Sequence, residues 1–572
     1  MTLQAGKRPD SVTLTTMSIR YVPHGAADLI ASLALYLALC GTALPWFLRR
    51  VGPDAVSYIS VAMKYRDGHF ADAVNGFWSP AFSWLLAPFV RLGPPPEAIA
   101  RCLQVLIGAG TLTAIWWLCL RLDLPRAVRR FVTLGCVPAV ALYALSETSP
   151  DLLVAALLTV YIGVVVAEGY PRSTAEAAAA GAIGGLAYLA KAYAFPFFLL
   201  HFSVLSCWLL FRSRKESREF RRVWVASVAG LLAFAAIAGP WVAVVSRAYG
   251  RFTFGTTGVY QAGLAVGQRN PTRMHVLVPP PNPTAISAWE DPTAHLKSGA
   301  AAVAAPARAD LGRPAVSAPS QSVPRRSPAS DFERLTRRLV HNVWQLLSVL
   351  LRLSVLSPLI LFGLAALIAA KSGRPLRDRA VVLLGTILIY PSGYLLIFLV
   401  PRYLWLLTFL LAASAGLLAM SPWWPTRPLA RAWLAAVLLA SFAAWPCWVI
   451  ARLWVNVLEE TPAIAARLAA DIPPGTRISS DSEWGISNSI AYHLRCRYHG
   501  MAPAGMPADE EAGLLAEQQV AVFFAWDDPD RHAVLRTARP LPPLAVASRP
   551  LRVFLLGPSS TGGDEPASET KP

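Results

Sequence analysis

Long apolar segments separated by short polar loops constrain this chain more than any other feature. A helix needs about 17–25 apolar residues to cross the hydrocarbon core of a bilayer. Hydrophobic residues make up 55% of the 572 residues and charged residues only 15%, with a mean hydropathy of +0.45, which is unusual for a soluble protein. We therefore predict about eleven spanning helices, near residues 26–47, 99–120, 131–146, 151–167, 176–191, 193–211, 223–245, 342–370, 380–400, 403–420 and 430–451.

The positive charges suggest an orientation for these helices. The formal charge of +18 is spread over short loops without a basic stripe, which argues against nucleic acid as a partner. With residues 1–25 as a cytoplasmic N-terminal tail, the loops expected inside are rich in Arg or Lys, as is usual for cytoplasmic loops. These loops are 121–130, 212–222 and 371–379. Arg49, Arg50, Arg337 and Arg338 then lie outside, against this trend.

The first apolar segment has two interpretations. Residues 39–43 are rich in small side chains, so the segment could be a cleaved signal. Its apolar stretch is longer than a signal core and a long polar leader precedes it, which favours an uncleaved anchor. Asp54 is extracytoplasmic in either case.

Three regions are expected to protrude on the outer side. Residues 48–98 form the first outer loop, in which Val56, Ile59 and Met63 have the spacing of a helix lying along the membrane surface. Residues 279–330 are rich in Pro and Ala and predict a flexible insertion. Residues 456–558 alternate strand-like and helix-like runs, so we expect a small extracytoplasmic α/β domain, followed by a disordered tail at 559–572.

Five ionisable residues are predicted to meet at the outer face. Asp54 follows the first span, Glu147 and Asp151 lie in one turn, Lys191 separates two spans and Arg402 begins another. Ionisable groups at membrane depth are costly and are often functional. A carboxylate can remove a proton from an acceptor, while Lys or Arg can neutralise a leaving phosphate. These residues therefore fit sugar transfer from a lipid phosphate.

Each of these residues also has a simpler interpretation. Asp54 and Asp151 could stabilise the first turn of a helix, and Glu147 could be a solvated turn residue. Lys191 could extend to the interface, and Arg402 could anchor a helix end. No His pair has convincing metal spacing, so no metal and no other cofactor is predicted, although a divalent ion remains compatible with the carboxylates.

The chain also resembles the GT-C membrane glycosyltransferases, in particular their ArnT-like, protein-mannosyltransferase-like and RgtA/B/C/D-like branches. The resemblance covers most of residues 26–450 and lies in the order of several short motifs rather than in one strict signature. These motifs are DAVSYIS at 54–60, Gly68 with Ser79-Pro80, SPD at 149–151, GLAYLAK at 185–191 and PRYL at 401–404. The resemblance implies a mainly α fold, with a transmembrane GT-C-like domain at 26–455 and the small α/β domain after it.

The resemblance further implies inverting transfer of a sugar from a polyprenyl-phosphate donor to a glycolipid, polysaccharide or protein acceptor. Asp54 matches the acidic residue of the first outer loop, the proposed general base, and Asp151 matches an assisting acidic position. Lys191 and Arg402 match places where contacts to the donor phosphate are expected. Ala55 departs from the family, which often has a second acidic residue there, and this argues against a paired-carboxylate metal site.

Two other classes of function stay open at this stage. A polytopic transporter would also have many spans, but it more often has polar residues at the midplane and two related halves. A non-catalytic envelope scaffold could act through residues 456–558 alone. The resemblance favours the enzyme and implies a multi-pass protein of a bacterial inner membrane, in contact with membrane lipids.

Overall fold

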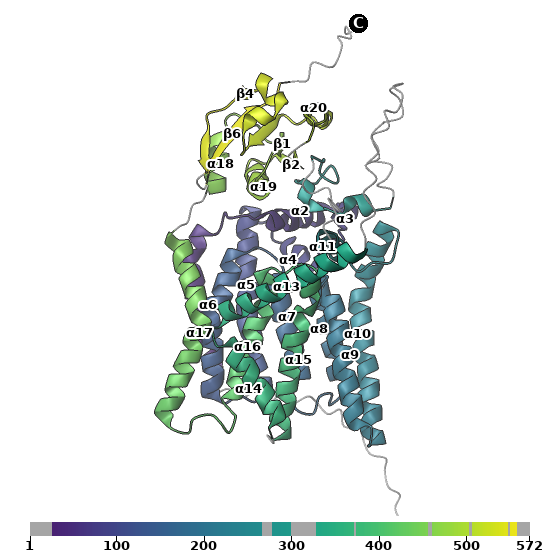
Figure 1. Ribbon diagram of the computed structural model, residues 1–572, viewed down its shortest axis with the longest axis vertical. Coiled ribbons are helices and arrows are strands. Elements are labelled where there is room, and N and C mark those ends of the chain that lie inside the picture. Colours follow the sequence, from purple (N-terminus) through teal and green to yellow (C-terminus); the bar gives the residue numbers. More distant parts are fainter. Residues whose placement is uncertain are drawn as a thin grey trace, which may run out of the picture.

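The computed structural model describes residues 26–265, 277–298, 328–370, 373–455, 460–502, 506–546 and 549–557. A bundle of long helices forms one part, and a small sheet domain lies beyond one end of it (Figure 1). The short helices α2 and α3 lie between the two parts, at the same end of the bundle (Figure 1). Within the described residues, eight helices are long and apolar enough to cross a membrane, so the protein is an integral multi-pass membrane protein.

All eleven apolar segments expected from the sequence are helical. The helices of the bundle are α1 (Ala26–Ala43), α5 (Pro96–Arg121), α6 (Arg126–Ser146), α7 (Asp151–Val165), α8 (Thr174–Ala190), α9 (Ala194–Ser213), α10 (Ser217–Tyr249), α13 (Pro328–Leu353), α14 (Ser357–Ala369), α15 (Arg374–Leu396), α16 (Trp405–Leu418) and α17 (Pro428–Val455). Asp28, at the start of α1, forms ion pairs with Arg126 and Arg130 at the start of α6, so both helices begin at the same end of the bundle.

The expected count of about eleven spans needs correction in two places. Residues 342–370 do not form one straight span, because α13 and α14 meet at an angle of 95°. The helix α7 has only 15 residues, and α8, with 17 residues, is at the lower limit of the length that crosses a bilayer. One expected segment is therefore too short, one is only just long enough and one is bent. Hydropathy does not report such bends, which depend on how the helix packs.

Small residues allow α8 and α10 to pack closely. Gly181 of α8 faces Gly230 of α10, and a Cβ atom added at Gly181 would lie 1.9 Å from the carbonyl oxygen of Gly230. A Cβ atom at Gly230 would in turn lie 2.4 Å from the ring of Phe202. Small residues at helix interfaces let backbones approach in this way, since lipid supplies no hydrophobic drive between helices.

Gly181→Val is therefore expected to destabilise the helix bundle by about 1–3 kcal/mol or more, because overpacking forces the helices apart. The measurement is the unfolding of the purified protein in detergent micelles. Gly110→Val is the matched control, since no atom lies within 4 Å of a Cβ atom added at Gly110. Equal losses in the two variants would contradict the proposed close contact.

The end of the bundle next to the sheet domain, called its outer end for this position, carries the helices α2 (Pro53–Asp67), α3 (Phe70–Ala73), α4 (Ala81–Leu86) and α11 (Thr257–Ala265). Pro53 occupies the first turn of α2, where its missing N–H costs nothing, and Gly68 ends the helix with φ of 81°. Val56 and Ile59 are fully buried, so α2 is packed into the protein rather than lying free on the membrane.

The expected flexible insertion at 279–330 is corrected in its first part. Residues 277–298 pack against α2, where Lys64 and Glu290 form an ion pair with both side chains only 2% exposed. Burial raises the pKa of the Glu290 carboxyl, although Lys64 and Ser60 oppose the rise. A buried charge needs such a partner, so the pair fastens the segment to α2. Residues 299–327 lie outside the described residues, as do the expected tails at 1–25 and 559–572.

The sheet domain has the expected α/β character. Its strands β2 (Arg497–Met501), β1 (Arg477–Ser480) and β3 (Val522–Ala525) are parallel neighbours in this order, and β6 (Arg549–Leu555) pairs antiparallel with β3. The short strands β4 (Arg539–Pro540) and β5 (Leu544–Val546) both pair with β6. The helices are α18 (Glu460–Leu468), α19 (Trp484–His493) and α20 (Ala508–Glu517).

The sheet domain docks on the outer helices through α19. The hydroxyl of Ser489 donates a hydrogen bond to the carbonyl oxygen of Val51 at 2.8 Å. A Cβ atom added at Gly485 would lie 3.2 Å from the ring of Pro53, so the start of α19 touches the start of α2. Tyr492 donates to the Glu97 carboxylate at 2.9 Å. These contacts bring the domain directly beside Asp54.

His532 is held between two carboxylates in the sheet domain. Asp481 first and Glu511 second raise the pKa of His532 to about 9, although burial opposes the rise. Because this value exceeds the ordinary 6.5 of an unfolded His, the stabilisation is complete below pH 6.5 and disappears as pH rises through 9. We expect the domain to lose about 3 kcal/mol of stability over this range.

Pulse proteolysis of the full-length protein, with release of C-terminal peptides measured at each pH, tests this expectation. His532→Gln should reduce the difference in domain stability between acidic and alkaline pH, because Gln does not titrate. If stability falls with pH equally in the variant and the wild type, His532 does not cause the fall.

Candidate active site

Arg402 lies at the centre of a charged cluster at the outer end of the helix bundle. It belongs to the short 3-10 turn Pro401–Leu404, between α15 and α16. One terminal nitrogen of its guanidinium forms an ion pair with Asp54, and the other lies 3.2 Å from Glu147 Oε2. Its Nε lies 3.6 Å from Asp151 Oδ2. One cation therefore contacts three carboxylates that come from different elements.

Asp151 is the most buried carboxylate of the cluster. Its side chain is only 4% exposed, and it begins α7 directly after Pro150. Ser149 donates a hydrogen bond to Asp151 Oδ2 at 2.8 Å, and Lys191 forms an ion pair with Oδ1. These partners, together with Arg402, supply the compensation that a buried carboxylate needs.

Lys191 lies in the break between α8 and α9, where the helical hydrogen bonding stops. Its Nζ lies 3.6 Å from the centre of the Tyr403 ring, in addition to the pair with Asp151. The ring of Tyr403 stacks on that of Tyr394 with 5.0 Å between the centroids. An aromatic face beside the ammonium group favours its charged form and holds it in place.

All five residues predicted from the sequence are thus brought together around one point. Asp54, Glu147 and Asp151 supply three negative charges, and Lys191 and Arg402 supply two positive ones. The buried Arg101 interacts electrostatically with Glu147, so a third positive charge lies beside the cluster. Among the residues that the structure describes, no group of three or more His, Cys, Asp or Glu side chains is arranged to hold a metal ion.

Trp289 also belongs to this site, although no motif of the sequence predicted it. Its indole N–H points to Asp54 Oδ1 at 3.4 Å, and its ring lies 4.8 Å from that of Trp484 in the sheet domain. A tryptophan followed by two acidic residues in an Ala/Pro/Ser-rich stretch was the available signal, because such residues rarely stand in flexible insertions. The aromatic pair covers the outer side of Asp54.

A cavity of about 470 Å³ extends from the cluster between α6, α13, α16 and α17. Glu147 and Arg402 line its polar part, and Arg352 of α13 adds a further cation. The guanidinium of Arg352 lies 5.7 Å from the Trp445 ring centre. Most of the other lining side chains are apolar, which suits a ligand with a charged head and a hydrocarbon chain.

Two solved structures are similar to this chain in fold. The crystal structure of ArnT from Cupriavidus metallidurans bound to undecaprenyl phosphate matches with a TM-score of 0.55 and 14% identity, over 94% of this chain and 100% of that one. The apo state of the same protein matches with a TM-score of 0.41 and 16% identity, over 95% of this chain and 100% of that one. No protein-family model matches the sequence, and no curated protein matches it.

The first of these likenesses defines the fold. The chain has the GT-C fold of membrane glycosyltransferases, with a transmembrane helical domain and a small C-terminal α/β domain. This outcome confirms the fold class expected from the sequence motifs.

Proposed function

We propose that the protein transfers a sugar from a polyprenyl-phosphate-linked donor to an acceptor of the cell envelope at the extracytoplasmic face. The observation that carries this proposal is the position of Arg402, which contacts Asp54 and also lines the largely apolar cavity of α6, α13, α16 and α17. A donor whose hydrocarbon chain occupies this cavity would bring its phosphate to Arg402. The similarity in fold to a protein bound to undecaprenyl phosphate supports a donor of this kind.

The proposed reaction is an inverting displacement at the anomeric carbon. Asp54 accepts the proton of the acceptor hydroxyl while the acceptor oxygen forms a bond to that carbon. The bond between the carbon and the phosphate oxygen breaks, and its electron pair stays on the phosphate. Arg402 and Lys191 stabilise the negative charge that develops there, and Asp151 holds both cations in position.

The pairing of Arg402 with Asp54 gives a reason for ordered binding. While Asp54 is held in its ion pair with Arg402, that carboxylate oxygen is not free to accept the proton of an acceptor hydroxyl. A donor phosphate competes for the same guanidinium, since arginine binds phosphate through two parallel hydrogen bonds. Donor binding would therefore free Asp54 for the acceptor proton.

Comparative mass spectrometry of envelope glycolipids, polysaccharides and glycoproteins tests the proposal. A strain lacking the protein should lack one sugar-bearing species, which the wild-type chain restores. Purified protein should also form that species from a polyprenyl-phosphate-sugar donor and the acceptor so identified. Identical profiles with and without the protein, under conditions in which it is expressed, would refute sugar transfer.

A further inference from the structure

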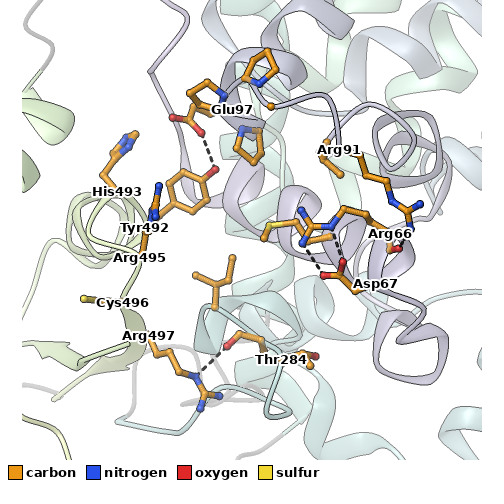
Figure 2. Close-up of a pocket in the computed structure, with 18 of the residues that line it drawn as sticks. Arg66, Asp67, Arg91, Glu97, Thr284, Tyr492, His493, Arg495, Cys496 and Arg497 are labelled. Carbon is orange, nitrogen blue, oxygen red and sulfur yellow. Dashed lines mark hydrogen bonds and ion pairs between the residues drawn. The ribbon is translucent and has the colours of Figure 1, made fainter. Parts of the chain in front are cut away.

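A second, larger cavity lies between the sheet domain and the outer helices. Its volume is about 1060 Å³, at the upper end of the range for ligand sites. Residues of α2, of the loop before α5, of the segment 277–298 and of the sheet domain line it, and their side chains point toward a shared space (Figure 2). The hydrogen bond from Tyr492 to Glu97 joins two of its walls (Figure 2).

Positive charge dominates this cavity. Five arginines line it, Arg49, Arg66, Arg91, Arg495 and Arg497, against the two carboxylates of Asp67 and Glu97. Asp67 is already engaged by Arg66 through two hydrogen bonds of 2.7 Å. Glu97 is 7% exposed and accepts from the neutral Tyr492, so among the lining carboxylates its charge alone is left to balance the other four arginines.

Several hydrogen-bond donors of the cavity have no acidic partner. Within the described parts of the chain, Arg49, Arg91 and Arg495 make no ion pair with a carboxylate. Arg497 donates to two backbone carbonyl oxygens, those of Ala285 at 3.3 Å and Asn282 at 3.1 Å. These groups are ready to bind an anion.

The helix α2 runs between the reaction centre and the cavity. Asp54 lies in its first turn, and Arg66, which lines the cavity, lies near its other end, about 18 Å away along the axis. Arg49 also lines the cavity and precedes Asp54 by five residues. An acceptor of about this length with its reacting hydroxyl at Asp54 would therefore place its far end in the cavity.

We propose that this cavity binds the anionic part of the acceptor, a saccharide that carries phosphate or carboxylate groups. That the bound molecule is the acceptor rests on the proposed sugar transfer. Anion binding by the cavity does not depend on that function. Guanidinium groups match the planar geometry of carboxylate and phosphate oxygens, and several of them around one cavity select for more than one negative charge. Tyr492 and the prolines at 94–96 offer apolar faces for sugar rings.

Binding of defined saccharides to the full-length protein tests this site. The protein is placed in lipid discs of zwitterionic lipid, and binding is measured by microscale thermophoresis without any donor. The anionic probes are trigalacturonate and maltose 1-phosphate, and maltotriose is the neutral probe. We expect at least one anionic probe to bind, with an affinity that falls as salt rises, and maltotriose not to bind.

A double variant, Arg49→Gln with Arg495→Gln, removes one charge from each wall of the cavity. We expect it to weaken anion binding by about tenfold or more. The matched control is Arg531→Gln with Arg536→Gln, which removes the same charge from exposed positions of the sheet domain outside the cavity and should bind as the wild type does. Asp54→Asn should also bind the anionic probes normally.

Three results would overturn the proposal. These are binding of neither anionic probe, equal binding by the cavity variant and its control, and loss of probe binding when an anionic phospholipid is added to the discs. The last result would assign the cavity to lipid headgroups instead. If probes bind as expected but no strain comparison reveals a missing sugar, the cavity stands and sugar transfer fails, so the two proposals fail separately.

Discussion

Asp54→Asn is expected to lower the rate of sugar transfer by about 10²–10⁴-fold while the protein remains folded, because removal of a general base has an effect of this size. Asn has nearly the same shape as Asp, but it has a single acceptor oxygen, so it can keep the hydrogen bond from Arg402 or the one from Trp289. The measurement is the rate of product formation with purified protein and the donor and acceptor identified from the strain comparison. Donor binding should be retained, because the donor phosphate is proposed to contact Arg402 rather than Asp54.

Asp123→Asn is a suitable control for this experiment. Asp123 also forms an ion pair with an arginine, Arg379, but it is 65% exposed and lies in the loop between α5 and α6. Its φ of 53° is one that Asn tolerates as well as Asp. The rate of sugar transfer by Asp123→Asn should match that of the wild type. Full activity of Asp54→Asn would show that another group removes the proton, and the non-catalytic scaffold would then regain support.

Arg402→Gln is expected to abolish transfer and also to destabilise the protein by about 2–3 kcal/mol, since Asp54, Glu147 and Asp151 would lose a shared cation. Arg402→Lys should recover part of the stability, because a single ammonium group keeps the charge but cannot reach three carboxylates from one planar group. Unfolding in detergent micelles and binding of a polyprenyl phosphate are the two measurements.

A double-variant cycle separates the two roles of Arg402. If its charge compensates Asp54, Arg402→Gln should cost less stability when Asp54→Asn is already present, since contacting residues are not additive. Arg374→Gln is the control, because Arg374 is exposed at the beginning of α15, the helix that leads to Arg402. Additive losses for Asp54 and Arg402, or an unchanged affinity for polyprenyl phosphate in Arg402→Gln, would contradict the proposed arrangement.

Pairing of Arg402 with Asp54 also bears on the order of events during turnover. The guanidinium is shared among three carboxylates, so the proposed base and the proposed phosphate contact hold each other in place. A donor phosphate would replace these contacts with stronger ones and release the carboxylate. This exchange would limit abstraction of acceptor protons to complexes that already hold donor.

The membrane helices could be predicted because their signal is local. Apolar runs of nearly the required length stand between polar loops, and each expected run is helical in the structure. The strands were also predictable, since Thr476–Ser480 and Val520–Phe524 have the β-rich composition of the observed β1 and β3. By contrast, the 95° break between α13 and α14 depends on packing and has no clear signature in hydropathy.

The five charged site residues were predictable as a set because topology places alternate loops at the same end of the bundle. Topology does not specify which of them touch, and the sequence did not indicate that Arg402 would contact three carboxylates. Trp289 was missed because its neighbours suggest a flexible segment, whereas the buried pair of Lys64 and Glu290 fastens this segment to α2.

The membrane environment, the helices and the end of the bundle at which the charged residues gather follow from the sequence, because hydropathy and the alternation of loops between the two ends are properties of short stretches of chain. The contacts around Arg402, those of Trp289 with Asp54 and Trp484, and the arginine-lined cavity beside the sheet domain arise only when the chain is folded. These features join residues more than 200 positions apart, and their geometry depends on the packing of whole elements, which no local pattern encodes.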